Sequence, residues 1–163
     1  MRFSSTLAIL GLIAGLAHSA TAAEPVRVGT FHQQAIVVAY YRSPLWAETL
    51  KQKFAERAAA KQAGDEKKVK ELEAWGGAAQ ELTHRQLAGS APLTNILEAL
   101  QPAFAEISQK EHLARIVSGS APADPAVQTV DVTDQLLDWL TADEATRKIV
   151  LELRKPHAPP PGK

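Results

Sequence analysis

The chain has 163 residues, with 18 Lys and Arg against 18 Asp and Glu, no Cys, and 45% apolar residues. This length and composition are typical of one globular domain. The balanced charge is unsuited to sequence-independent binding of nucleic acid, which needs a net basic face. The lack of Cys excludes disulfide bonds, thiolate metal sites and a cysteine nucleophile.

Residues 1–22 are predicted to be a secretory signal that is cleaved. Arg2 supplies a positive charge, residues 7–16 form an apolar stretch, and residues 20–22 (Ala-Thr-Ala) place small side chains where signal peptidase cleaves. A membrane anchor is the weaker interpretation, because a span needs about 20 apolar residues. Loss of Arg2 takes the 18 basic residues to 17, against 18 acidic ones, so the mature net charge is −1. We therefore expect a periplasmic or otherwise extracytoplasmic protein without stable membrane insertion.

A strand is predicted at residues 26–31, where the side chains alternate in apolar character after Pro25. Residues 33–41 are apolar with a partly helical pattern. A helix is expected to begin at Pro44, because Ser43 can cap its free N–H groups and proline suits the first helical turn. The mature domain is thus predicted to start with a strand and continue into helices.

The segment after Pro44 is predicted to form helices that pair along two apolar stripes. Trp46 and Phe54 of the first stripe are interpreted as core or helix–helix contacts. Gly64, the pair Gly76 and Gly77, and Gly89 are the candidate turning points, because glycine disfavours a helix interior. The first stripe contains Leu45, Trp46, Leu50, Phe54 and Ala58, and the second contains Val69, Leu72, Trp75, Ala79 and Leu82.

Turn residues divide the second half of the chain. Residues 89–92 (Gly-Ser-Ala-Pro) are predicted to end one helix and begin another, with Ser90 as the cap of the second helix. Pro102 is expected to kink that second helix, because proline has no N–H group to donate.

Residues 113–117 and 127–132 are predicted to be strands. Thr133 is expected to cap the following helix, and residues 141–144 (Thr-Ala-Asp-Glu) fit a capping box that begins a last helix at about 142–154.

These elements predict an α+β fold. Its parts are a small antiparallel sheet of two to three strands, an extended helical hairpin and C-terminal helices. Residues 155–163 are rich in proline and have few side chains to bury, so they are predicted to be a disordered tail.

The order of elements resembles the Skp/OmpH family of periplasmic chaperones. Members of that family begin with a strand like residues 26–31 and continue into a long helical hairpin. They return through a strand like residues 113–117 and close with a segment like residues 131–137 (Asp-Val-Thr-Asp-Gln-Leu-Leu). Asp124 and Pro125 add to the resemblance, which covers the two ends of the mature chain and extends to the middle through its helical character.

The resemblance implies one Skp/OmpH-like domain at residues 23–154, with a helical hairpin at about 44–112. It also implies a homo-oligomer, a trimer, whose arms enclose an unfolded outer-membrane protein. We therefore expect a holdase-like chaperone that binds unfolded or partly folded envelope proteins. The alternative is a non-catalytic envelope scaffold that binds a folded partner or itself, because the arms are short and the chain is neutral.

Catalytic, cofactor-binding and metal-binding residues are not predicted. The histidines lack the spacing of three to five residues that is common among zinc ligands. Ser90 and Ser120 lie in Gly-Ser-Ala-Pro turns, without the strand-turn-helix setting of a nucleophilic serine. The histidines beyond the signal are His32, His84, His112 and His157.

Acidic residues near the C-terminus are also interpreted structurally. Asp131 and Asp134 suit helix capping and the first helical turn, and Asp138 follows on the same helix. We expect a protein that is not an enzyme and that needs no cofactor. A hydrolase or metal protein built around His84 and these three carboxylates is a third and weaker hypothesis.

Overall fold

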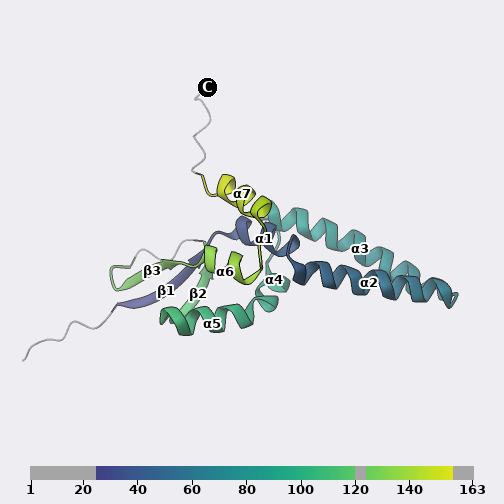
Figure 1. The fold of residues 1–163 in the computed structure, drawn as a ribbon, viewed down its shortest axis with the longest axis horizontal. Helices are drawn as coiled ribbons and strands as arrows, with labels where there is room; N and C mark the ends of the chain where they lie inside the picture. The colour runs from purple at the N-terminus through teal and green to yellow at the C-terminus, as the bar shows by residue number, and fades with distance from the viewer. Residues whose placement is uncertain (1–24, 120–123, 156–163) are drawn as a thin grey trace, which may run out of the picture.

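The computed structural model describes residues 25–119 and 124–155 (Figure 1). The predicted signal at residues 1–22 lies outside this part of the chain, as does the predicted tail from residue 156 onward, so both stay predictions. The described elements are, in chain order, β1 (Val26–Phe31), α1 (Gln33–Tyr41), α2 (Pro44–Gln62), α3 (Glu66–Leu87), α4 (Thr94–Ala99), α5 (Gln101–Glu111), β2 (Arg115–Ser118), β3 (Val127–Asp131), α6 (Thr133–Trp139) and α7 (Glu144–Leu153).

The sheet has three strands in the order β2-β1-β3, and both outer strands run parallel to β1. Gly29 of β1 lies opposite Ile116 of β2 and Val130 of β3. The predicted antiparallel sheet is therefore wrong. Alternating side chains indicate that a segment is extended and which face it buries, but they carry no information on strand direction. The helices between β1 and β2 return the chain to the same end of the sheet, which parallel pairing requires.

The helix-covered face of the sheet is closely packed at Gly29. A Cβ atom at this position would lie 2.8 Å from Leu113 Cδ1 and 2.9 Å from Ile116 Cγ1. Both distances are shorter than normal contacts between carbon atoms. The missing side chain therefore lets the chain that enters β2 approach the central strand.

Helix α1 lies in the middle of the core. Ala35, Ile36, Val37 and Ala39 are fully buried, as expected for a helix that is apolar on nearly every side. It contacts α3, α6 and α7, while α4 and α5 complete the same hydrophobic cluster. The apolar pattern of residues 33–41 therefore belongs to a buried helix.

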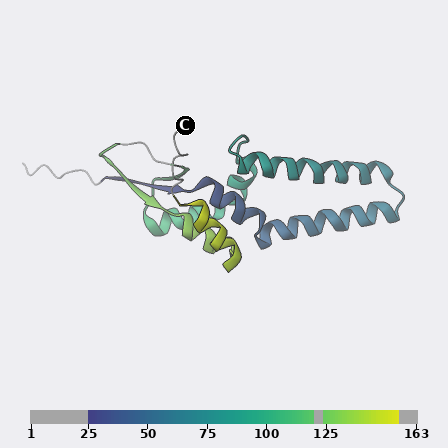
Figure 2. The ribbon, with the colours of Figure 1, turned by 90° about the horizontal axis from the view of Figure 1, so that it is seen from above.

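Helices α2 and α3 form an antiparallel hairpin, here called the arm, which projects away from the rest of the molecule (Figures 1 and 2). The 19 residues of α2 correspond to a length of about 28 Å at 1.5 Å per residue. Residues 44–112 do not form one long hairpin, because the arm ends at Leu87 and α4 and α5 lie against the core. The arm is accordingly shorter than the resemblance implies.

The arm turns at Gly64, one of the three candidate turning points. Its φ of +69° is a left-handed conformation that glycine adopts at little cost. The next residue, Asp65, caps α3 by accepting a hydrogen bond from the Lys68 backbone N–H at 2.9 Å. Gly76 and Gly77 lie within α3, so they do not interrupt the helix.

The predicted cap of α2 is confirmed, since Ser43 Oγ accepts a hydrogen bond from the Trp46 N–H at 3.3 Å. Ser90 does not cap α4, because its hydroxyl donates to the Arg85 carbonyl and α4 begins after Leu93 without a side-chain cap. A kink within one helix was predicted at Pro102. Instead, α4 ends at Ala99 and a separate helix, α5, begins with Pro102 in its first turn.

Two predicted caps near the C-terminus are wrong. Thr133 lies inside α6, and its Oγ1 accepts a hydrogen bond from the His32 backbone N–H at 3.0 Å. Helix α7 is capped by Asp143, whose carboxylate accepts from the Thr146 N–H at 2.7 Å, and Thr141 lies before the cap with a φ of 52°. A capping box and an Asp cap overlap in residue types, so the sequence alone did not separate them.

Candidate client-binding surface

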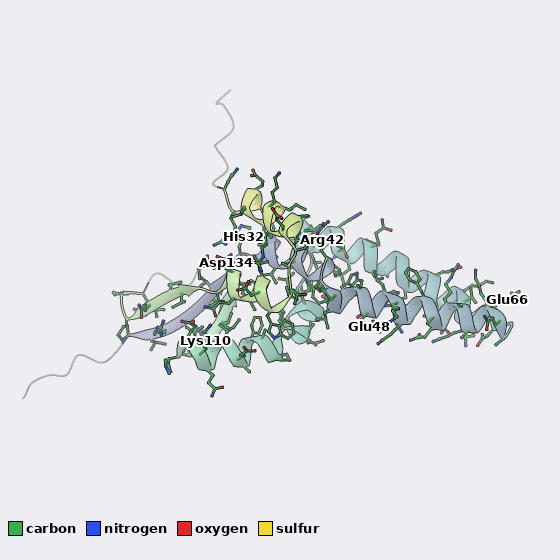
Figure 3. All side chains as sticks on the ribbon, in the orientation of Figure 1. His32, Arg42, Glu48, Glu66, Lys110 and Asp134 are labelled. Atoms are coloured by element: carbon green, nitrogen blue, oxygen red, sulfur yellow. The ribbon has the colours of Figure 1, made fainter. Side chains whose placement is uncertain are left out.

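A cleft lies at the base of the arm, at the junction of α2 and α3 with the core. It has a volume of about 390 Å³, and its lining is mostly apolar. Arg42 and Glu48, labelled in Figure 3, lie near this junction along the chain. Because four helices supply its walls, the cleft exists only when the arm is folded against α1. The lining residues are Tyr40, Tyr41, Trp46, Thr49, Lys53, Trp75, Ala78, Ala79, Leu82 and Asn95.

Aromatic rings form one wall of the cleft. Tyr41 and Trp46 meet edge to face with ring centroids 5.0 Å apart, and Trp46 lies 6.0 Å from Trp75 on the other helix of the arm. Aromatic pairs at such distances contribute favourable contacts beyond the area they bury. Tyr40 extends the cluster toward the core, where burial and then the neighbouring Tyr41 raise the pKa of its phenol. Both tryptophans are only partly buried, so part of each ring remains accessible to a ligand.

A polar network anchors the cleft to the core through Gln86, whose side chain is fully buried. Its Oε1 accepts a hydrogen bond from Tyr41 OH at 2.8 Å. Its Nε2 donates to Asn95 Oδ1 and to the Pro92 carbonyl, each at 2.7 Å. Asn95 Nδ2 in turn donates to Tyr41 OH at 3.2 Å. One glutamine therefore holds together the end of α1, the end of α3 and the start of α4.

The predicted stripe of α3 is the face that meets α2, because all five of its side chains are at least partly buried. On α2 the predicted stripe is only partly correct: Trp46 makes the expected helix–helix contact with Trp75, but Phe54 does not. Ala60 and Leu72 are buried between the helices, and Arg57 forms an ion pair with Glu73 across them. The hydrogen bond and the charge of Arg57 lower the pKa of the Glu73 carboxyl. Phe54 is 65% exposed, so its interpretation as a core or helix–helix contact is wrong. A stripe at helical spacing marks an apolar face but does not say whether that face meets a partner.

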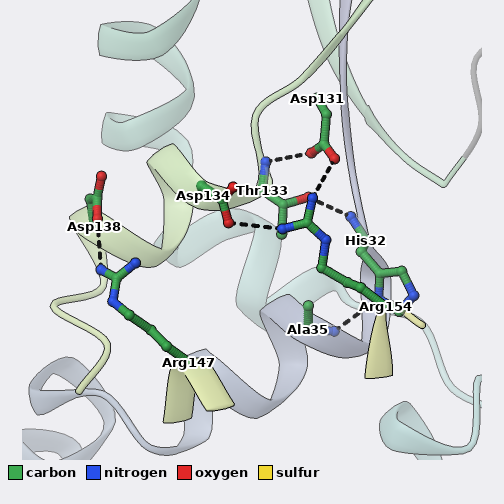
Figure 4. Close-up of polar contacts among 8 residues, drawn as sticks. All are labelled: His32, Ala35, Asp131, Thr133, Asp134, Asp138, Arg147 and Arg154. Atoms are coloured by element: carbon green, nitrogen blue, oxygen red, sulfur yellow. Dashed lines mark hydrogen bonds and ion pairs between the residues drawn. The ribbon is translucent and has the colours of Figure 1, made fainter. Parts of the chain in front are cut away.

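Ion pairs hold the C-terminal helix against the core (Figure 4). Arg154 donates to Asp131 Oδ2 and to Asp134 Oδ1, both at 2.8 Å, and Arg147 donates to Asp138 Oδ1 at 2.6 Å. Partial burial acts to raise the pKa of the Asp131 carboxyl, but hydrogen bonds from Thr133 and the charge of Arg154 lower it overall. The three acidic residues considered as ligands thus serve to fasten α7.

His32, His84 and His112 belong to different elements of the described fold. His32 precedes α1, where its Nδ1 accepts a hydrogen bond from the Ala35 N–H at 3.3 Å, while His84 is exposed on α3 and His112 ends α5. Within residues 25–119 and 124–155, no group of three or more His, Cys, Asp or Glu side chains is placed to hold a metal ion. Ser120 and His157 lie outside the described residues.

Sequence reasoning did not identify the network of Gln86, Tyr41 and Asn95 beside the cleft. Gln86 continues the spacing of the second stripe four residues after Leu82, so a polar residue in an apolar row was the available signal. Tyr41 lies 45 residues before Gln86 along the chain, and Asn95 lies on the next helix, α4. No local sequence pattern links either residue to Gln86.

No helix in the described part of the chain combines the length and apolar character needed to cross a membrane. Comparison of the chain with protein-family models, with curated proteins and with solved structures found no match. We therefore infer function from the geometry of the chain.

Proposed function

We propose that this protein is a non-catalytic, holdase-like chaperone of the periplasm. It binds apolar segments of unfolded or partly folded envelope proteins, including outer-membrane proteins, in the cleft at the base of the arm. The observation that carries the proposal is the open aromatic cleft formed by Tyr41, Trp46 and Trp75.

The chemistry of the cleft suits clients of varied sequence. Tyrosine and tryptophan offer large apolar surfaces and have few rotatable bonds, so little side-chain entropy is lost when they bind. Lys53 lies with its Nζ 5.9 Å from the centre of the Trp75 ring, at the edge of the cleft. Contacts of this kind are not specific for one side chain, which is what binding of unfolded chains requires.

The arm supplies a second favourable property. It carries many charged and exposed side chains, among them Glu48 and Glu66 (Figure 3), so a bound apolar segment is surrounded by a hydrated surface. A client held in this way keeps its apolar groups from other unfolded chains. The resemblance to Skp/OmpH chaperones adds a homotrimer to the proposal, which a solution mass of the mature protein tests directly.

The proposal is tested by suppression of aggregation of a denatured outer-membrane protein. We expect the mature protein, residues 23–163, to suppress aggregation at near-stoichiometric ratios. In a Trp139→Phe background, the fluorescence of Trp46 and Trp75 should change as the client is added, because these two tryptophans then report on the cleft alone.

A matched pair of variants locates the binding site. Trp75→Ala should require at least tenfold more protein for equal suppression, because aromatic anchors contribute about 2 kcal/mol or more to binding. Leu151→Ala removes an apolar side chain that is 61% exposed on α7, outside the cleft, and should have no effect. Absence of suppression over a broad range of ratios overturns the proposal. Stable binding of one folded envelope protein without suppression would favour the scaffold.

A further inference from the structure

A second groove lies between α5 and the edge strand β2. It has a volume of about 570 Å³ and is open to solvent. In Figure 1, β2 lies on the side of the sheet nearest to α5. Residues of α5 form one wall, the strand forms the other, and Phe31 and Leu97 also line it. An edge strand beside a helix is the arrangement with which some domains bind an extended peptide as an added strand.

Within residues 25–119 and 124–155, the outer edge of β2 has no strand partner. β2 pairs with β1 alone, so alternate backbone N–H and C=O groups point away from the described sheet. An exposed strand edge of this kind is a template for pairing with another extended chain. The opposite edge strand, β3, differs because its end at Asp131 is covered by the Arg154 ion pair and it carries exposed polar residues.

Apolar side chains cover the floor of this groove. Phe104 of α5 stacks on Phe31 of β1, with ring centroids 6.0 Å apart and an angle of 24° between the rings. Leu97 and Ile116 are partly buried beside them. A strand added to β2 would direct every second side chain toward this floor and the others toward solvent. The groove therefore fits a segment in which apolar and polar residues alternate.

The charge of the groove favours segments that carry an acidic group. Arg115 is the one charged residue among those that line it, and it forms no ion pair with another described residue. Arg115 is exposed at the start of β2 and lines the groove, so its guanidinium is available to a carboxylate of a ligand. An acidic residue near the end of the added strand would supply that carboxylate.

We propose that this groove binds extended segments of alternating apolar and polar residues as an added strand on β2, with an acidic group of the segment on Arg115. The strands of outer-membrane β-barrels have this alternation over about ten residues. An unfolded barrel protein therefore offers many such segments. That the segments come from unfolded barrel proteins rests on the proposed chaperone function. The binding of such a segment in the groove does not depend on that function.

The probe is a fluorescent ten-residue peptide of alternating Val and Thr with a terminal Asp, measured by anisotropy with the mature protein. We expect binding that falls at least tenfold when alternate peptide nitrogens are methylated, because methylation removes the donors that pair with β2. Equal binding of the two peptides overturns strand addition. Arg115→Glu should reverse the preference between peptides ending in Asp and in Lys, and Arg85→Glu, on α3, should not.

Two substitutions of exposed residues on α5 test whether the peptide binds in the groove. Ala105 is exposed and lines the groove, so Ala105→Trp should fill it and reduce peptide binding at least tenfold. Lys110, labelled in Figure 3, is exposed on α5 and does not line the groove, so Lys110→Trp should leave binding unchanged. Equal effects of both variants, or none, would overturn the proposal.

Two further measurements separate this inference from its alternatives. Sedimentation of the Ala105→Trp variant shows whether the groove instead holds a second copy: loss of a self-associated form with peptide affinity unchanged overturns the inference. The second measurement is suppression of client aggregation, made on the same proteins whose peptide binding is measured. Suppression by a protein that does not bind the peptide overturns the inference alone, and peptide binding without suppression overturns the proposed function alone.

Discussion

The buried Gln86 network is expected to determine the stability of the cleft. Gln86→Met keeps a side chain of similar length and volume but removes both the amide donor and the carbonyl acceptor. Three hydrogen bonds of Gln86 are lost, those to Tyr41, Asn95 and the Pro92 carbonyl. Because Met fills much of the same space, little is added for a cavity.

The size of the effect follows from these three bonds. A hydrogen bond contributes about 1 kcal/mol net to stability, so the substitution is expected to lower the free energy of unfolding by about 3 kcal/mol. For a domain of this length, that corresponds to a fall in Tm of about 10 °C. Tyr41→Phe removes two hydrogen bonds of the hydroxyl, the one it donates to Gln86 and the one it accepts from Asn95, but leaves the amide of Gln86 paired with Asn95. It should lower the free energy of unfolding by about 2 kcal/mol.

Urea unfolding followed by tryptophan fluorescence measures both effects, because Trp46 and Trp75 lie beside the network. In the Gln86→Met background, Tyr41→Phe should have a smaller effect than in the native chain, since the partner of the hydroxyl is already gone. A loss below about 0.5 kcal/mol for Gln86→Met, or full additivity of the two substitutions, would refute the reasoning that these groups act as one network.

Further predictions concern the acid side chain at the end of β3 and three glycines. The lowered pKa of Asp131 stabilises the native state above the pKa of the unfolded chain, and this contribution is lost as pH falls through the native pKa. The stability difference between the native chain and Asp131→Asn should therefore be constant from about pH 5 to 7 and shrink below about pH 4, as measured by urea unfolding at each pH. Gly64→Ala should cost about 1 kcal/mol because of the positive φ, whereas Gly76→Ala, inside α3, should stabilise the protein by up to about 1 kcal/mol in the same assay. Gly29→Ala should lower the free energy of unfolding by about 1–3 kcal/mol, because the new methyl group meets Leu113 and Ile116, and a change within error would contradict the close packing of the strand.

Several elements were predictable because their causes are local. β1 begins and ends at the predicted residues, and α2 begins at Pro44 with Ser43 as its cap. Extended alternation, a capping hydroxyl and the backbone preference of proline act over a few neighbouring residues. The same local reasoning failed at Thr133, whose hydroxyl bonds instead to the backbone of His32, a hundred residues earlier.

Most of the candidate site was not predictable in this way. Trp46 and Trp75 were both placed in apolar stripes, but the stripes did not show that the two rings lie 6.0 Å apart. Phe54 was assigned to a helix contact and is mostly exposed. Helical periodicity defines a face, and the partner of that face depends on how the helices rotate when the arm folds.

The sequence by itself determined those elements whose signals are local, such as the alternation of β1 and the Ser43–Pro44 start of α2. Only the tertiary structure decided the parallel direction of the strands, the turn of the arm at Gly64, and the joining of Tyr41, Gln86 and Asn95 into one network. These features depend on groups that are distant along the chain and meet only after packing, where a buried polar atom must find its partner.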